Sequence, residues 1–278
     1  MSQTAASPSL PTIAFIGGGN MASAIIGGLI HQGLPASQIE VVEPWAEARE
    51  ALRKNYGIEA QAEAGPALQR AGIVVWAVKP QTFKDAAAQA KSHTPAALHL
   101  SVAAGIRSSS IAQWLGTERI VRTMPNTPAL VGKGMSAIYA RPAVTPAERQ
   151  SVEAIMASTG EFLWVESEKQ LDAVTALSGS GPAYVFYFLE AMTRAGVSMG
   201  LSEQQAHQLA VGTFVGASEL ARRSDEPPAV LRQRVTSKGG TTYAALQSME
   251  GAGVGPAFEH AMEAARQRAD ELGNEFGG

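Results

Sequence analysis

The sequence predicts an α/β fold class, in which a Rossmann-type N-terminal domain with a mainly parallel sheet is followed by an all-α C-terminal domain. Short apolar runs alternate with helical patterns up to about residue 165, and a glycine-rich turn joins the first run to the first helical pattern. From Ser167 onward the apolar runs stop, and helical patterns follow one another to the end. We therefore divide the chain into residues 1–165 and 166–278.

Composition excludes several classes of protein. The 278 residues are 45% hydrophobic, which is enough for a sizeable core, and the formal net charge is −3. Because the chain has no global basic field, we expect neither a nucleic-acid partner nor an anionic membrane surface as a partner. The absence of cysteine excludes disulfides, thiolate catalysis and zinc–thiolate sites, and it fits a reducing compartment.

Neither a metal site nor a membrane span is expected. The five histidines show no metal-ligand spacing, so we interpret them as surface or packing residues. No apolar stretch approaches the roughly 20 residues that a membrane helix needs. Met1–Leu10 are small and polar, without the basic start and apolar run of a signal peptide. We expect them to form a loose tail on a soluble, cytoplasmic protein.

The first predicted strand and helix meet at a glycine-rich turn. Ile13–Ile16 is an apolar run, and a helical pattern begins near Ala22. Gly17-x-Gly19-x-x-Ala22 matches the dinucleotide fingerprint: the first glycine makes the turn, the second admits a pyrophosphate, and the small third residue lets the helix pack on the strand. The pattern predicts a dinucleotide site. The alternative is a glycine-rich turn with a purely structural role.

Glu43 bears on which dinucleotide binds. It closes the predicted strand Ile39–Glu43, 24 residues beyond Gly19. An acid there accepts hydrogen bonds from the adenosine ribose hydroxyls and favours NAD, because a carboxylate repels a 2′-phosphate. The alternative is a solvated acid at the end of a strand. Arg49 and Arg53 lie in the next helix within reach of a phosphate, so both NADH and NADPH stay open.

Three later strands end in small loops that contain glycine or proline. They are predicted at Ile73–Val78, Leu98–Val102 and Arg119–Thr123. Since ligands bind at the carboxyl ends of parallel strands, we expect the loops to line one crevice. Met135–Tyr139 and Phe162–Val165 are predicted as added edge strands, with a helix at Pro146–Ser158 between them.

The second half is predicted to be helical throughout. The expected helices span residues 168–177, 182–199, 202–223, 226–235, 241–249 and 255–272. Ser202-x-x-Gln205 has the pattern of a capping box at one helix start. An aromatic cluster is interpreted as core or subunit interface, and it consists of Tyr184, Phe186, Tyr187 and Phe188.

Two segments of this half place glycines and hydroxyls ahead of a helix, namely Ser178–Tyr184 and Thr236–Thr242. Each would offer free backbone amides at a helix N-terminus, where the dipole favours an anion such as a carboxylate. The alternative for either segment is a helix–helix turn. Ser180 does not lie in a GxSxG nucleophile elbow, and no GxxxxGK[ST] phosphate loop occurs.

Over nearly its whole length the chain resembles the pyrroline-5-carboxylate reductase family. The resemblance rests on Phe15–Met21, Ala77–Gln81, Ala103–Ile106, Met124–Ala129, Asp172–Tyr184 and Val235–Thr242, of which the last two are highly specific. It implies a helical domain that dimerises by interleaving with its partner. It also implies assembly of the homodimer into a larger homo-oligomer such as a decamer.

The resemblance also implies roles for particular residues. The cofactor, NADPH or NADH, would be held by Ile16, Gly17, Gly18, Gly19, Asn20, Met21, Ala77, Val78, Lys79, Pro80, Val102, Ala103 and Ala104. The substrate, pyrroline-5-carboxylate, would be held by Glu168, Ser237, Gly239, Gly240, Thr241 and Thr242. Two positions depart from the family pattern and bear on cofactor preference. Glu43 stands where members that prefer NADPH carry a small polar residue, and Ala64 stands where some have an asparagine at the adenosine.

The reaction implied by the resemblance is hydride transfer from the nicotinamide C4 to C5 of the cyclic imine, which gives L-proline. An iminium accepts hydride better than a neutral imine, so the ring nitrogen must be protonated before or during the transfer. Thr242 is the candidate catalytic residue, as hydrogen-bond partner or proton relay, and solvent is the alternative proton source. Orientation of the substrate by the helix N-terminus would supply most of the catalysis.

Two other functions remain as alternatives. A β-hydroxyacid dehydrogenase or another imine reductase shares the two-part plan, but it needs a catalytic lysine on a helix of the second domain. Lys169 and Lys238 are the only lysines beyond residue 165. A dinucleotide-sensing regulator is the non-enzyme alternative, and no DNA-binding motif supports it.

Overall fold

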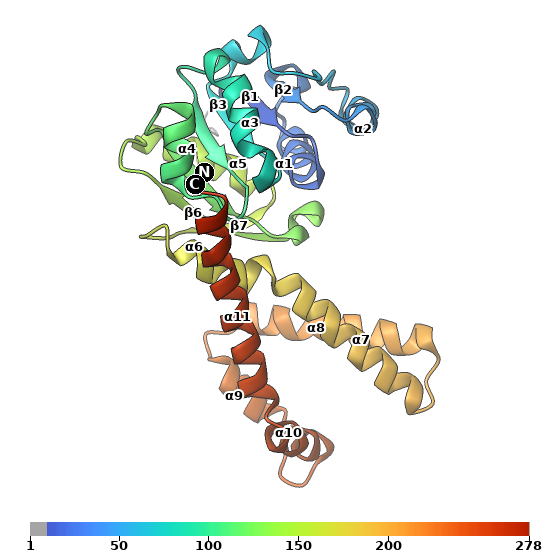
Figure 1. Ribbon diagram of the computed structural model, residues 1–278. Helices are drawn as coiled ribbons and strands as arrows, with labels where there is room; N and C mark the ends of the chain where they lie inside the picture. The colour runs from blue at the N-terminus through green and yellow to red at the C-terminus, as the bar shows by residue number, and fades with distance from the viewer. Residues whose placement is uncertain (1–9, 278) are drawn as a thin grey trace, which may run out of the picture. The chain divides into compact units, whose positions relative to one another are not determined.

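The computed structural model describes residues 10–277. The expected tail, Met1–Leu10, lies outside this range except for Leu10. The chain forms two compact units: the first contains the residues up to Ser180 together with those from Ala265 onward, and the second is Gly181–Ala264 (Figure 1). The second unit is therefore an insertion in the chain of the first.

The first unit is built on a seven-stranded sheet with strand order β2-β1-β3-β4-β5-β6-β7. The strands are β1 (Ile13–Ile16), β2 (Ile39–Val42), β3 (Ile73–Trp76), β4 (Leu98–Ser101), β5 (Ile120–Met124), β6 (Gly134–Ala140) and β7 (Gly160–Trp164). Strands β1 to β5 are parallel, β6 is antiparallel to β5, and β7 is parallel to β6. The predicted mainly parallel sheet is confirmed.

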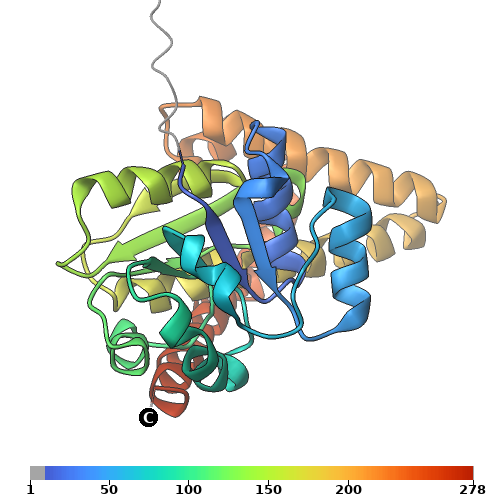
Figure 2. The same ribbon diagram turned by 90° about the horizontal axis from the view of Figure 1, so that it is seen from above.

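Helices cover both faces of this sheet. They are α1 (Asn20–His31), α2 (Ala46–Tyr56), α3 (Pro80–Ala90), α4 (Ser108–Leu115), α5 (Pro146–Ala157) and α6 (Gln170–Val174), with short 3₁₀ turns at Ala36–Gln38, Pro66–Arg70, Lys91–His93 and Thr127–Val131. Figure 2 shows α1 and α5 on one face and α3 and α4 on the other. Because both faces are covered, the central strands are apolar throughout, as parallel strands usually are.

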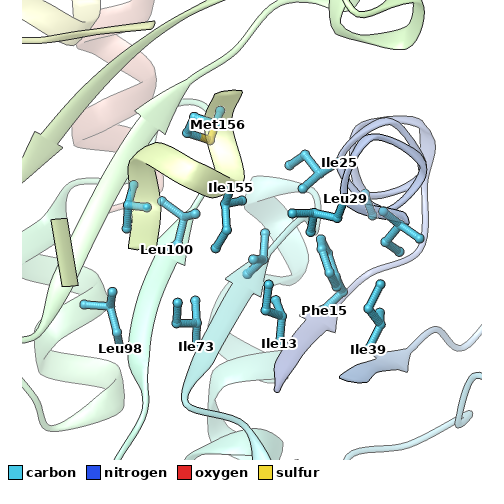
Figure 3. Packing of buried hydrophobic residues seen from close by; sticks show 14 of the residues in the cluster. Ile13, Phe15, Ile25, Leu29, Ile39, Ile73, Leu98, Leu100, Ile155 and Met156 are labelled. Atoms are coloured by element: carbon cyan, nitrogen blue, oxygen red, sulfur yellow. The ribbon is translucent and has the colours of Figure 1, made fainter. Parts of the chain in front are cut away.

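The core between the sheet and the helices α1 and α5 is tightly packed. Figure 3 shows Ile13 and Phe15 of β1 beneath Ile25 and Leu29 of α1, all of them almost completely buried. A second cluster on the opposite face packs Trp76 against α3 and α4. These two layers hold the strand ends at one edge of the sheet in fixed positions.

The structure corrects two details of the predicted strands. β3 ends at Trp76 instead of Val78, because Ala77 and Val78 belong to the loop that leaves the sheet. Met135–Tyr139 was expected at an edge, but β6 lies between β5 and β7, and only β7 takes the outer position. The reason is the helix α5 between them, whose crossover brings β7 back parallel to β6 on its free side.

The second unit is helical, as predicted. It contains α7 (Gly181–Ser198), α8 (Glu203–Arg223), α9 (Pro228–Arg234), α10 (Thr241–Gly251) and the start of α11 (Val254–Glu275). The predicted capping box is confirmed, since the Ser202 hydroxyl accepts from the Gln205 amide and the Gln205 side chain accepts from the Ser202 amide. Among these helices and the described residues, none is long and apolar enough to cross a bilayer.

The inserted unit has little core of its own. In α7 to α10 only Gly196, Ala206 and Ala210 are buried. Tyr184 and Phe188 pack edge-on against Phe258 of α11. Large apolar side chains elsewhere face outward, among them Phe186 (58% exposed), Tyr187 (66%), Leu209 (59%), Val215 (66%) and Leu220 (69%). An exposed apolar surface of this extent is typical of an interface.

One histidine is buried inside the first unit. The Trp76 indole Nε1–H donates to His99 Nδ1 over 3.1 Å, and His99 is 2% exposed. Burial, and to a smaller degree the positive charge of Arg119, lowers the pKa of His99 to about 4. The neutral imidazole is therefore the form that the fold accepts.

This burial predicts that the protein loses stability in mild acid. The pKa of His99 is lower in the folded state than in the unfolded chain. The stability that neutral His99 allows is therefore fully present above pH 6.5, and it is lost as the pH falls toward 4. Between pH 7 and pH 5 the free energy of unfolding should fall by about 2 kcal/mol from this group. The His99→Gln variant keeps a side-chain oxygen that can accept from Trp76 but has no group that titrates in this range. Urea unfolding at pH 7 and pH 5 should therefore show that the variant lacks this decrease in the free energy of unfolding. An identical pH dependence in both proteins would contradict the assignment.

Candidate active site

The glycine turn after β1 needs glycine at its first position. Gly17 has φ +97°, and a Cβ on it would lie 2.5 Å from the carbonyl oxygen of Ala77. The Gly17 amide donates to the Val42 carbonyl, and the Ala77 amide donates to the Ile16 carbonyl, each over 2.8 Å. The loops after β1 and β3 are therefore in direct contact at the carboxyl edge of the sheet.

The start of α1 leaves backbone donors for a ligand. Within residues 10–277 the amides of Gly19, Asn20 and Met21 donate no hydrogen bond to another residue, and the space beside Gly19 is open. A helix N-terminus of this kind favours a negative charge. The turn can therefore accept the diphosphate of a dinucleotide, with backbone amides as the donors.

Glu43 directly supports the same turn. Its Oε2 accepts from the Gly18 amide over 2.6 Å and its Oε1 accepts from the Trp45 amide over 2.9 Å. Glu43 is 5% exposed, so its interpretation as a solvated acid at a strand end is wrong. The carboxylate is buried, and two backbone amides replace the water that it gives up.

The two arginines of α2 have partners of their own. Arg49 Nη1 donates to the backbone carbonyls of Glu43 (2.9 Å) and Pro44 (2.7 Å). Arg53 pairs with Glu50. Arg49 thus places a positive charge at the carboxyl end of β2, beside the Glu43 backbone.

The remaining residues expected to hold the cofactor lie at the same edge of the sheet. Lys79 and Pro80 form the start of α3, after the loop that begins at Ala77. The Val102 amide donates to the Trp76 carbonyl, and the Ala103 amide donates to the Ser101 hydroxyl. The structure therefore brings together three segments, Ile16–Met21, Ala77–Pro80 and Val102–Ala104, at the carboxyl ends of β1, β3 and β4.

Glu168, which precedes α6, is held by three hydrogen bonds. Its carboxylate accepts from the Ser108 amide (2.5 Å), from the Ser108 hydroxyl (2.6 Å) and from Arg122 Nη1 (2.6 Å). Burial alone would raise the pKa of Glu168, but the Arg122 charge and the Ser108 hydrogen bonds outweigh it, so the pKa lies below its ordinary value. The carboxylate is thus ionised at neutral pH, and 20% of the side chain remains accessible.

Sequence reasoning missed both residues that hold Glu168. A signal for Arg122 was present, since a charged residue inside the buried strand β5 requires an ionic partner. Ser108 gave no such signal, because a serine at a helix start usually serves only as a cap.

The corner at Ser237–Thr242 has the local geometry that its sequence predicts. Gly239 has φ +75°, the Gly240 amide donates to the Ser237 carbonyl, and α10 begins at Thr241. Thr241 and Thr242 are exposed in the first turn of this helix. The corner belongs to the inserted unit, whereas the glycine turn and Glu168 belong to the first unit.

The other predicted segment, Ser178–Tyr184, does not begin as a loop with free amides, and this part of the prediction is wrong. A π-helical turn over Thr175–Gly179 continues α6, and the Ser180 amide donates to the Thr175 carbonyl. A Cβ on Gly179 would lie 2.6 Å from Met124 Cε, the flexible end of that side chain. The Asn126 side-chain amide donates to the Ser178 carbonyl over 3.1 Å, so this segment is tied to the loop after β5.

No metal centre is apparent in the part of the chain that the structure describes, which has no group of three His, Cys, Asp or Glu side chains able to hold an ion. Lys169 precedes α6 and Lys238 lies in the loop before α10. The catalytic lysine of a β-hydroxyacid dehydrogenase would have to lie on a helix, and neither of these two lysines does.

Known families match both parts of the chain. Residues 168–272 match the family described as pyrroline-5-carboxylate reductase dimerisation. Residues 12–105 match the family described as NADP oxidoreductase, coenzyme F420-dependent. A pyrroline-5-carboxylate reductase of Pseudomonas aeruginosa is 45% identical over 97% of this chain and 99% of its own length. One of Pasteurella multocida is 39% identical over 94% of this chain and 97% of its own length.

Solved structures agree with these sequence matches. A pyrroline-5-carboxylate reductase of Coxiella burnetii superposes with a TM-score of 0.88 at 36% identity, over 95% of this chain and 99% of its own. The Plasmodium falciparum enzyme, solved with NADP bound, superposes with a TM-score of 0.85 at 29% identity, over 95% of this chain and 98% of its own.

The buried pair between Arg122 and Glu168 predicts a large loss of stability on removing one partner. Arg122→Met leaves the Glu168 carboxylate without its cation, which should lower the free energy of unfolding by about 3 kcal/mol at pH 7. The loss should shrink below pH 4.5, the ordinary pKa of a glutamate, because protonation removes the unbalanced charge.

The matched control is Arg119→Met, which removes an arginine just before the same strand, paired with Glu148 and more exposed. It should cost less than about 1 kcal/mol. Equal losses in urea unfolding of the two variants would show that Glu168 does not depend on Arg122.

Proposed function

The chain belongs to the pyrroline-5-carboxylate reductase family, and we propose that it reduces 1-pyrroline-5-carboxylate to L-proline with NADPH or NADH, the final step of proline biosynthesis. The observation that carries this function is the glycine turn with three unused amides, placed beside the loops after β3 and β4. In parallel sheets of this kind a dinucleotide binds across the carboxyl ends of the strands. The absence of cysteine supports a cytoplasmic location.

The residues of the first unit would hold the cofactor along the carboxyl ends of β1, β3 and β4. The amides of Gly19, Asn20 and Met21 would bind the diphosphate. Glu43 supports the Gly18 amide and adds a negative charge at the adenosine end. The loops Ala77–Pro80 and Val102–Ala104 would line the nicotinamide end. When bound, the reduced nicotinamide supplies the hydride.

Two groups of residues are proposed for the substrate, each within its own unit: Glu168 in the first unit and the corner at Ser237–Thr242 in the inserted unit. The N-terminus of α10 offers amides and the Thr241 hydroxyl to the substrate carboxylate. Thr242 would hydrogen-bond to the ring nitrogen, with solvent as the alternative proton source. Glu168, held as a carboxylate by Arg122 and Ser108, would be the charged group of the first unit that contacts the substrate. Orientation of the imine carbon toward the hydride is the main contribution of these residues.

The inserted unit would be the dimerisation interface. Its helices expose large apolar side chains and bury few, and residues 168–272 match the family's dimerisation region. A second copy of the chain would cover this surface. We further propose that dimers assemble into a larger homo-oligomer such as a decamer.

The function is tested by mixing the protein with pyrroline-5-carboxylate and following the absorbance of the reduced nicotinamide, separately with NADPH and NADH. The absorbance should fall, and one proline should form for each molecule of reduced cofactor consumed. If neither cofactor is consumed while both bind, the protein is a dinucleotide-binding protein of another kind.

Thr242→Ala should lower turnover more than cofactor affinity, because the residue is proposed to contact the reacting nitrogen and not the nucleotide. We expect a decrease in kcat of roughly 10- to 100-fold, in the lower range for loss of a proton-transfer or orienting group. Thr242→Ser, which keeps the hydroxyl, should retain most of the activity. Unchanged turnover in Thr242→Ala would remove the residue from the mechanism.

Glu43→Ser should raise the use of NADPH relative to NADH, because the carboxylate that repels a 2′-phosphate is gone. Both affinities should also decrease, since serine is too short to hold the Gly18 amide. Glu47→Gln, an exposed acid in the first turn of α2, is the matched control and should leave the ratio unchanged. An unaltered NADPH-to-NADH ratio in Glu43→Ser would show that Glu43 acts only on the turn.

Light scattering of the intact protein should give the mass of a dimer or a multiple of it, because the exposed apolar surface of the inserted unit should be buried against a second copy of the chain. A stable monomer at micromolar concentration would refute the proposed interface.

A further inference from the structure

Arg107 contacts the chain on both sides of the inserted unit. It lies at the end of the loop after β4, directly before α4. Its Nη1 donates to both carboxylate oxygens of Asp172 (3.1 and 2.9 Å), and its Nη2 donates to Asp270 Oδ1 over 2.6 Å. Asp172 lies in α6, before the chain leaves the first unit at Ser180, and Asp270 lies in α11, after the chain returns at Ala265. One guanidinium therefore joins three segments that are remote in sequence.

The loop and the returning helix are packed too closely for larger residues. A Cβ on Gly273 would lie 2.6 Å from Arg107 Nε, so glycine lets the guanidinium lie against the α11 backbone. Gly105 has φ +70°, and a Cβ on it would lie 3.0 Å from Leu272 Cβ. One turn further along α4, the Ser110 hydroxyl donates to the Gly277 carbonyl over 2.7 Å. The contact is thus a continuous interface of the loop and α4 with the end of α11.

The positive charge of Arg107 is balanced by the carboxylates of Asp172 and Asp270. Only 20% of its side chain is exposed, and 8% of that of Asp172. Burial alone would lower the pKa of Arg107, but the Asp172 and Asp270 carboxylates outweigh it and raise the pKa. Arg107 is the cation that both carboxylates share, and loss of either one leaves it with a single partner.

The position of the loop relative to the dinucleotide follows from the strand order. The diphosphate site is at β1, and Glu43 marks the adenosine side at β2. The other half of the dinucleotide must extend the opposite way, over the ends of β3 and β4. The loop Val102–Arg107 follows β4, so it borders the nicotinamide half and not the adenosine half.

We propose that Arg107 is a positioning residue, which fixes the loop after β4 at the nicotinamide end of the cofactor by binding Asp172 and Asp270. This inference rests on the proposed dinucleotide binding. Arg107 itself does not touch the reacting atoms. Because Arg107 binds α11, the position of that helix determines where Val102–Ala104 lie, and these residues would line the nicotinamide.

The test compares two ligands that differ only in the nicotinamide. NADH and ADP-ribose share the adenosine, the diphosphate and the second ribose, so both use the glycine turn. Their dissociation constants are measured by calorimetry on the full chain for Arg107→Met and for the milder Asp270→Asn, which keeps the Asp172 contact. Arg268→Met is the matched control, because Arg268 lies on α11 with Asp270 and pairs with Glu271 and Glu275 on the surface of that helix.

Arg107→Met should weaken NADH binding roughly tenfold, and Asp270→Asn by about threefold, while ADP-ribose binding changes less than about twofold in both. Arg268→Met should change neither ligand. If the binding of NADH and of ADP-ribose is weakened equally, Arg107 stabilises the whole unit and not the loop in particular. If NADH binding is unchanged, the loop does not need Arg107. Either result overturns the proposal. If the unaltered protein binds neither NADH nor NADPH, the proposed function itself fails.

Discussion

The contact between Gly17 and the Ala77 carbonyl is the constraint on which the site depends. It is possible only without a side chain at residue 17, and it sets the separation of the loops after β1 and β3. Because β2 pairs with one side of β1 and β3 with the other, the strand order reverses at β1, and this contact lies at the switch point of the sheet. The amides of α1, the Glu43 carboxylate and the loop after β4 are all placed relative to it.

A second constraint is the balance of charge at the carboxyl ends of β4 and β5. Arg107 and Arg122 lie here together with Glu168, Asp172 and Asp270. Each buried group has an opposite charge within hydrogen-bond distance, as buried charges require. The cluster therefore keeps Glu168 ionised and fixes the start of α4 and of α6 in one arrangement.

Much of the first unit could be predicted from local sequence. The strands appear as apolar runs, and the turn at Gly17–Gly19 has a spacing that few other structures require. The segment Ser178–Tyr184 was misjudged because a π-helical turn and a glycine loop can contain the same residues, and no local spacing distinguishes them. The two hydrogen bonds of Glu43 to backbone amides were not foreseeable, since a carboxylate at a strand end carries no sign of which way it turns.

Contacts between distant residues were beyond sequence reasoning for a simple physical reason. Arg107 and Asp270 are 163 positions apart, and no periodicity links them. The helical half was predicted correctly as helices, because its apolar residues repeat at helical spacing. Its shortage of buried side chains could not be read from that pattern, because the spacing of apolar residues does not reveal whether they face their own chain or another.

The return of α11 to the first unit has a consequence for folding during synthesis. The last strand of the sheet ends at Trp164, but the segment that Gly105, Arg107 and Ser110 contact begins at Ala265. A chain leaves the ribosome N-terminus first, so the sheet emerges long before that segment does. Part of the surface of the first unit therefore stays uncovered until α11 has been synthesised and can dock.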